Sequence, residues 1–261
     1  MEPLQPRGLS RRYAEDLLSE ARRDRFAYDR IDVLSRHFLG YPYQPNPLIG
    51  SSDTPEVFTA SLDGFDCVTY IETILALARA SDVDEFVEWL RKIRYEQGRI
   101  EWKRRNHYMT QWIRNNVREG LLRPVSMPGV PTHSRERVLS AVPGLAAQRT
   151  RVKCVPKSAV PHAAEHLRSG DVICFVSTRK NLDVFHAGII VRDGKKLLMR
   201  HASRSRGCVV EQELNEFLKA NRMAGVIVVR PQVRTRRIAV RNQDHAVIDE
   251  SNSLLARERK A

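Results

Sequence analysis

The chain has 261 residues, of which 42% are hydrophobic, and this is enough for one substantial core. Aromatic residues make up 7% and neither glycine nor proline is in excess, so the composition excludes a fibrous or wholly disordered protein. No stretch approaches the roughly 20 apolar residues that span a bilayer, so we expect no transmembrane segment.

The net charge is +13, and part of the excess lies near the two ends of the chain. Such an excess favours solubility and can attract a polyanion, either nucleic acid or an anionic cell-wall polymer. The sequence has neither zinc-finger spacing nor a basic region followed by heptads, so we expect no specific nucleic-acid partner. The first seven residues are polar and lack the apolar core of a secretory signal. Either the protein stays in the cytoplasm or a signal was removed from this version of the sequence.

Helical spacing of apolar residues predicts helices in the first half of the chain. The segment after the second helix is rich in Pro, Gly, Ser and Asn and indicates an extended, ordered loop over 41–61. Prolines at 124, 128, 131, 143 and 156 favour short strands and loops between 120 and 165. The predicted helices are 11–23, 27–39, 83–97 and 107–117. A further helix begins at residue 66 or 67 and ends at residue 77 or 78.

The pattern changes to strands from Gly170 onward. Asp193-Gly194 between two apolar runs is a strong hairpin signal, and the last run is apolar throughout, as in a central strand. The predicted elements are strands over 171–176, 184–192, 196–202 and 225–230, with a short helix over 214–221.

Helices followed by a sheet indicate an α+β fold. We divide the chain into a helical extension over 1–27, one domain over 28–232 and a basic, flexible tail over 233–261.

The four cysteines form no C-x-x-C pair, so we expect no zinc site. Cys174 lies in an apolar strand and is expected to be a buried free thiol. Cys67 stands at the start of a predicted apolar helix, directly after Asp66, which can cap it. Because a helix start stabilises an anion, this position predicts a lowered thiol pKa and a nucleophile. Taken alone, the cysteine is better explained as a small buried residue.

A base for Cys67 can be found from the predicted hairpin. If Asp193-Gly194 form the loop, counting back along both strands places His186 opposite His201, with Cβ atoms about 4.5–5.5 Å apart. We therefore expect Cys67 to attack, His186 to accept its proton and His201 to orient His186. The alternatives are a surface histidine pair or a metal site.

Several segments together resemble the NlpC-type papain-like cysteine hydrolases of the bacterial cell wall. Others narrow the resemblance to one branch, the N-acetylmuramoyl-L-alanine amidase-like family, over roughly residues 28–230. At the nucleophile, Val68-Thr69 replaces the Ser-Gly of more typical members of the superfamily. The resembling segments are Leu39-Gly40-Tyr41-Pro42-Tyr43, Phe65-Asp66-Cys67-Val68-Thr69, Arg105-Asn106-His107-Tyr108, Leu182-Asp183-Val184-Phe185-His186, His186-Ala187-Gly188-Ile189-Ile190 and His201-Ala202-Ser203.

The resemblance implies a papain-like α+β fold, with N-terminal helices packed on an antiparallel sheet, and no metal or cofactor. It implies hydrolysis of the amide between N-acetylmuramic acid and L-alanine in peptidoglycan or muropeptides, in the periplasm or cell envelope. A stem-peptide endopeptidase and a non-catalytic module for anionic polymers stay as alternatives.

The resemblance also places Tyr43 close to the nucleophile as a hydroxyl donor. Asn106, His107 and Tyr108 form a polar and aromatic segment beside a helix start and are candidates for a substrate-binding wall. Their alternative is a helix cap with a packing tyrosine. Asp183 is either a loop cap, which we favour, or an orienting carboxylate.

Overall fold

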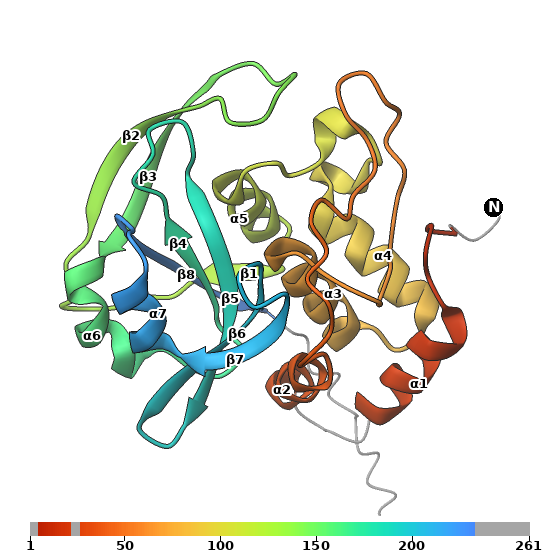
Figure 1. The fold of residues 1–261 in the computed structure, drawn as a ribbon, viewed down its shortest axis with the longest axis horizontal. Coiled ribbons are helices and arrows are strands. Elements are labelled where there is room, and N and C mark those ends of the chain that lie inside the picture. Colours follow the sequence, from red (N-terminus) through yellow and green to blue (C-terminus); the bar gives the residue numbers. More distant parts are fainter. Residues whose placement is uncertain (1–4, 22–26, 233–261) are drawn as a thin grey trace, which may run out of the picture.

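The computed structural model describes residues 5–21 and 27–232. One layer consists of helices, and the other is a sheet in which all named strand pairings are antiparallel (Figure 1). The predicted α+β class is confirmed. The predicted tail over 233–261 lies outside the described residues, and the division into an extension and one domain stays a prediction.

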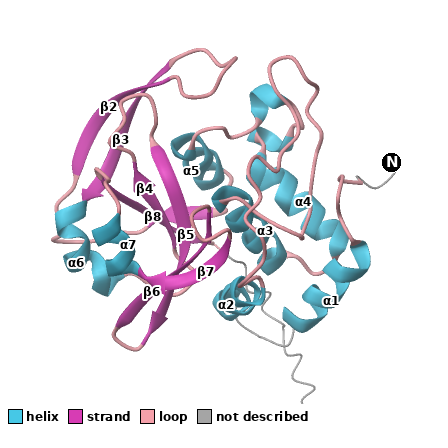
Figure 2. Cartoon of the chain, viewed as in Figure 1, coloured by secondary structure: helices cyan, strands magenta, loops and turns pink. Residues whose placement is uncertain are grey.

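The five long helices form where the apolar spacing predicts them, and their ends differ from the prediction by a few residues (Figure 2). No described helix combines the length and apolar character needed to cross a membrane. The helices are α1 (Arg11–Ala21), α2 (Ala27–His37), α3 (Cys67–Arg79), α4 (Val83–Arg94), α5 (Met109–Arg118), α6 (Val160–Ala163) and α7 (Leu214–Ala220), with single 3₁₀ turns η1 (Glu96–Gly98), η2 (Trp102–Arg104), η3 (Lys157–Ala159) and η4 (Ala164–His166).

Helix α3 is the centre of the molecule. Ten of its 13 residues are buried, and it packs against α2 and α4 on one side and the sheet on the other. A largely apolar helix of this kind is stable only when it is covered on most sides. Its first residue, Cys67, therefore lies where the helical layer meets the sheet.

The sheet has the order β2-β3-β8-β4-β5-β6-β7, and β1 pairs with β8. The predicted central position of the last strand is confirmed, because β8 lies between β3 and β4. Helices α6 and α7 cover the face of the sheet that is turned away from α3 (Figure 1). The strands are β1 (Leu122–Pro124), β2 (His133–Leu139), β3 (Gln148–Pro156), β4 (Val172–Val176), β5 (Val184–Asp193), β6 (Lys196–Ser203), β7 (Cys208–Glu213) and β8 (Gly225–Pro231).

Two parts of the sheet differ from the prediction. Between 120 and 165, where short strands and loops were expected, β2 and β3 form a regular hairpin of seven and nine residues. The edge strand β7 was not predicted at all. Half of the residues of β2 and β3 are exposed, and nearly all of these are charged or polar. Strand β7 buries one residue of six, so the apolar signal is weak in all three strands.

The predicted register of the β5–β6 hairpin is wrong by two residues. Asp193 pairs with Lys196 and Ile189 with Arg200, so the loop is Gly194-Lys195. Gly194 has a φ of +55°, which glycine adopts easily at the first position of a two-residue turn. Since side chains alternate along a strand, a shift by an even number leaves His186 and His201 on the same face. They are diagonal neighbours and not directly opposed.

Candidate active site

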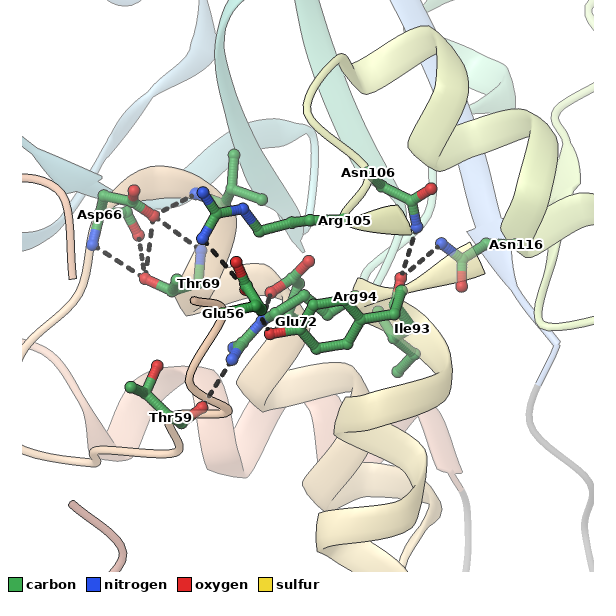
Figure 3. Close-up of polar contacts among 12 residues, drawn as sticks. Glu56, Thr59, Asp66, Thr69, Glu72, Ile93, Arg94, Arg105, Asn106 and Asn116 are labelled. Atoms are coloured by element: carbon green, nitrogen blue, oxygen red, sulfur yellow. Dashed lines mark hydrogen bonds and ion pairs between the residues drawn. The ribbon is translucent and has the colours of Figure 1, made fainter. Parts of the chain in front are cut away.

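Cys67 is the first residue of α3, and Asp66 is its N-cap, as predicted. The carboxylate Oδ1 of Asp66 accepts the N–H groups of Val68 at 3.0 Å and Thr69 at 2.8 Å. Thr69 returns the contact, because its Oγ1 accepts the N–H of Asp66 at 3.0 Å (Figure 3). This capping box fixes where the helix begins and therefore where the thiol lies.

His186 on β5 and His201 on β6 form a hydrogen bond of 2.7 Å between Nε2 of His186 and Nδ1 of His201. The predicted proximity of the two rings is thus confirmed despite the shifted register. A second hydrogen bond extends this pair to β7, where Oε1 of Gln212 lies 3.2 Å from Nε2 of His201. Phe217 stacks on His186, with ring centroids 5.3 Å apart, and the rings are held between α7 and the sheet.

Cys67 and His186 line the same cavity, which has a volume of about 480 Å³ and lies between the start of α3 and the middle of β5. Within the described residues, Nδ1 of His186 makes no hydrogen bond, because only its Nε2 is engaged, so Nδ1 is free to accept a proton. The sides of the cavity come from the 46–50 loop, the segment 105–109 and the start of β5. Of the predicted wall residues, Asn106, His107 and Asp183 line the cavity.

The expected lowering of the thiol pKa is wrong. Although Cys67 keeps part of its surface accessible, burial raises the pKa of its thiol to about 12, and the Asp66 carboxylate adds to the rise. Backbone N–H groups of Ala187, Cys67 and Val68 act in the opposite direction. At this helix start, desolvation of the thiolate therefore outweighs its stabilisation by the helix.

The two histidines are also held in their neutral forms. Burial lowers the pKa of His186 to about 3, with His201 contributing, and burial also lowers the pKa of His201. The hydrogen bond that His201 donates to the amide oxygen of Gln212 opposes the shift of the His201 pKa. Near neutral pH, the resting site accordingly combines a neutral thiol with two neutral imidazoles.

Tyr43 lies beside Cys67, as the resemblance implied. Its backbone pairs with Phe65, two residues before Cys67, and burial together with the Cys67 sulfur raises the pKa of its hydroxyl. The phenol therefore stays protonated and can donate a hydrogen bond. Tyr43 does not line the cavity.

Asp183 is a cap, but of a distant helix. Its Oδ2 accepts both the N–H and the hydroxyl of Thr110, each at 2.7 Å, and its Oδ1 accepts the N–H of Val184 at 2.7 Å. These bonds tie the start of α5 to the start of β5. The alternative role of Asp183 as a carboxylate that orients His186 finds no support in these contacts.

Asn106 and His107 face the cavity with side chains that are already bonded to the protein. Asn106 donates to the carbonyl of Ile93 at 3.2 Å (Figure 3). Its side-chain oxygen accepts from Asn115 at 2.7 Å. Nε2 of His107 lies 2.7 Å from the carbonyl oxygen of Trp102, and burial lowers its pKa. Both residues can shape the wall of the cavity.

The assignment of Tyr108 to the substrate wall is wrong. Its side chain is 1% exposed, it does not line the cavity, and its hydroxyl accepts the N–H of Val142 at 3.2 Å. It is the packing tyrosine of the alternative interpretation, because the backbone turns at the start of α5 and points residue 108 into the core.

Sequence reasoning missed four polar residues of the site. Gln212 lies on the unpredicted strand β7, so its approach to His201 could not be foreseen. Glu72 and Arg94 form a buried ion pair of 2.7 Å at the cavity, and a glutamate inside the apolar α3 was the available signal. Arg105 belongs to a segment that was quoted for its resemblance, but it received no role.

Comparison with known proteins identifies the chain. Residues 33–226 match the family described as N-acetylmuramoyl-L-alanine amidase-like. The chain belongs to this family. No curated protein matches it.

Solved structures agree with the family. An N-acetylmuramoyl-L-alanine amidase from Bacteroides uniformis ATCC 8492 is similar at 28% identity and a TM-score of 0.70, over 79% of this chain and 99% of that one. A Bacteroides fragilis protein with a provisional xylanase name is similar at 27% identity and a TM-score of 0.64, over 76% and 99%. A Legionella pneumophila protein, at 20% identity, a TM-score of 0.73 and coverage of 85% and 94%, shares the fold.

Proposed function

We propose that this member of the family is a cysteine amidase of the papain-like, NlpC-type superfamily. It hydrolyses the amide between N-acetylmuramic acid and L-alanine in peptidoglycan fragments. The observation that carries the proposal is a cysteine at a capped helix start that lines one cavity with His186, which is bonded to His201. The family and the amidase from Bacteroides uniformis support the substrate class.

The hydrogen-bond chain sets the protons needed for catalysis. For Nδ1 of His186 to act as a base, its Nε2 must carry the proton and donate it to Nδ1 of His201. His201 then carries its proton on Nε2 and donates to the amide oxygen of Gln212. The carbonyl-type oxygen of Gln212 therefore selects the tautomers of both histidines.

The reaction begins with a neutral pair, so proton transfer accompanies attack. The sulfur of Cys67 bonds to the lactyl carbonyl carbon while Nδ1 of His186 takes the thiol proton. The backbone N–H of Cys67, with the Tyr43 hydroxyl, is suited to stabilise the oxyanion, because Asp66 already accepts the N–H groups of Val68 and Thr69. His186 returns the proton to the leaving L-alanine nitrogen, and water then hydrolyses the thioester.

Digestion of purified muropeptides with product identification by mass spectrometry tests the proposal. We expect an intact stem peptide that begins with L-alanine, and we expect the folded Cys67→Ala variant to release none. A cut inside the stem would instead establish the endopeptidase alternative. If Cys67→Ala left a cell-wall phenotype unchanged, the non-catalytic binding module would replace the enzyme.

A further inference from the structure

The charged side chains that line the Cys67 cavity differ in how many hydrogen bonds and ion pairs they make with the rest of the protein. Asp66 and Asp183 accept backbone N–H groups at the starts of α3 and α5, so two helix starts stabilise these two carboxylates. Glu72 is 1% exposed and paired with Arg94. The three acidic groups that line the cavity thus have fixed partners inside the protein.

The two arginines of the cavity are not equivalent. Arg94 is buried and tightly bonded, to Glu72 at 2.7 Å and to the carbonyl of Thr59 at 2.6 Å. Arg105 keeps 13% of its side chain exposed, and its contacts, with Oε1 of Glu56 and the carbonyl of Gly50, are both 3.2 Å. These bonds use two of the five N–H groups of a guanidinium.

The counterion of Arg105, Glu56, also accepts a hydrogen bond from a second residue at the same oxygen. Oε1 of Glu56 accepts the hydroxyl of Tyr95 at 2.7 Å, while its Oε2 has no partner among the described residues. Arg105 therefore touches one oxygen of Glu56, without the bidentate geometry that a carboxylate allows. In Figure 3 the side chain passes above Glu56 toward Asp66 and Thr69 at the start of α3, and it lines the same cavity as Cys67.

We propose that Arg105 is a subsite for a carboxylate of the substrate, on the side of the leaving peptide. A guanidinium with unused donors in a partly desolvated cavity binds a carboxylate strongly. This inference rests on the proposed function, because the stem peptide that leaves with L-alanine then carries the carboxylate in question, that of D-glutamate. The enzyme should accordingly distinguish stems with a free D-glutamate carboxylate from stems in which that group is an amide.

Calorimetric binding to the Cys67→Ala protein tests this without turnover. The ligands are N-acetylmuramoyl-L-alanyl-D-glutamate with its side-chain carboxyl blocked as a methylamide, and the matched D-isoglutamine compound, which differs by one carboxylate. We expect the carboxylate form to bind roughly tenfold to hundredfold more tightly. Adding Arg105→Gln to this protein should bring the ratio of the two dissociation constants close to one. Adding Arg105→Lys instead should keep part of the preference for the carboxylate.

Arg99→Gln is the matched control, because this exposed arginine pairs with Glu101 and does not line the cavity. It removes the same charge and should leave the ratio unchanged. A ratio that survives Arg105→Gln and Arg105→Lys in folded proteins overturns the subsite, as does undetectable binding of both ligands. Turnover separates the two proposals. If the wild type cleaves neither ligand while the ratio depends on Arg105, the subsite stands and the amidase fails.

Discussion

At the scale of single residues, the site depends on how burial and hydrogen bonding fix protonation. Cys67 lies beside helical N–H groups that favour a thiolate, but burial and the Asp66 carboxylate favour the thiol. His186 is buried enough to stay neutral far below the ordinary histidine pKa. The site thus holds a neutral thiol and neutral imidazoles, in contrast to a preformed thiolate–imidazolium pair, so the proposed attack requires proton transfer as it occurs.

The raised thiol pKa predicts slow alkylation of Cys67 in the free enzyme. Since the thiolate reacts and a free cysteine has a pKa of about 8.5, iodoacetamide should modify Cys67 more slowly than a model thiol at pH 7. The rate should keep rising up to pH 10, where the model thiol has levelled off. Peptide mass spectrometry of timed samples measures this, with Cys67→Ala to identify the peptide. Faster reaction than the model thiol contradicts the assigned protonation state.

Gln212 is predicted to be a positioning residue for the histidine pair. Gln212→Ala removes the acceptor for His201 and should lower kcat about tenfold, with KM nearly unchanged. Gln212→Glu places a carboxylate beside His201, which raises the pKa values of the coupled histidines. The base is then protonated at higher pH, so the acidic limb of the kcat/KM profile should move upward. An unmoved limb in an active Gln212→Glu enzyme would show that Gln212 has only a structural role.

At the scale of elements, the start of α3 combines a structural cap with an electrostatic effect on the thiol. Asp66→Ala should destabilise the protein by about 1 kcal/mol in urea unfolding, because two helical N–H groups lose their acceptor. Asp66→Asn keeps an acceptor but removes the charge. It should therefore retain most of the stability while lowering the pKa of Cys67 and speeding its alkylation.

Asp82 provides the matched control for this prediction. It caps α4 by accepting the N–H of Glu85 at 2.8 Å, and it does not line the Cys67 cavity. Asp82→Ala should cost a similar free energy of unfolding without changing the reactivity of Cys67. If Asp66→Asn alkylates no faster than the wild type, the carboxylate has no influence on the thiol.

At the scale of the whole molecule, the Glu72–Arg94 pair ties α3 to α4 and, through the carbonyl of Thr59, to the loop that precedes α3. Glu72→Gln leaves the Arg94 charge buried without its partner and should cost about 3–5 kcal/mol in urea unfolding. The double variant Glu72→Leu, Arg94→Met should recover much of this loss, because no buried charge remains.

An exposed pair gives the contrast. Glu136 and Arg151 lie 2.8 Å apart on the β2–β3 hairpin with most of both side chains in solvent. Glu136→Gln should therefore change the free energy of unfolding by less than about 1 kcal/mol. Equal losses from Glu72→Gln and Glu136→Gln would mean that the buried pair does not hold the helices together.

The sequence alone determined the elements with a strong apolar period and the residues with distinctive chemistry. Helical spacing of apolar residues located the five long helices, and continuous apolar runs located the strands β4, β5, β6 and β8, because both patterns follow from burial. Cys67 after Asp66, together with two histidines on one hairpin, was sufficient to name the three proposed catalytic residues. The predicted register of the β5–β6 hairpin was off by two residues. His186 and His201 still lie on the same face, because side chains on a strand alternate between the two faces.

The tertiary structure decided what depends on contacts between distant segments. Strands β2, β3 and β7, which lie toward the two edges of the sheet, carry a weak apolar signal, so Gln212 on β7 could not be placed. Asp183 caps α5 across 73 residues, and Tyr108 turns into the core, which no local pattern reveals. The pKa of the Cys67 thiol also depends on contacts between distant segments. The helix start is visible in the sequence, but the burial that outweighs it exists only once the sheet packs against α3.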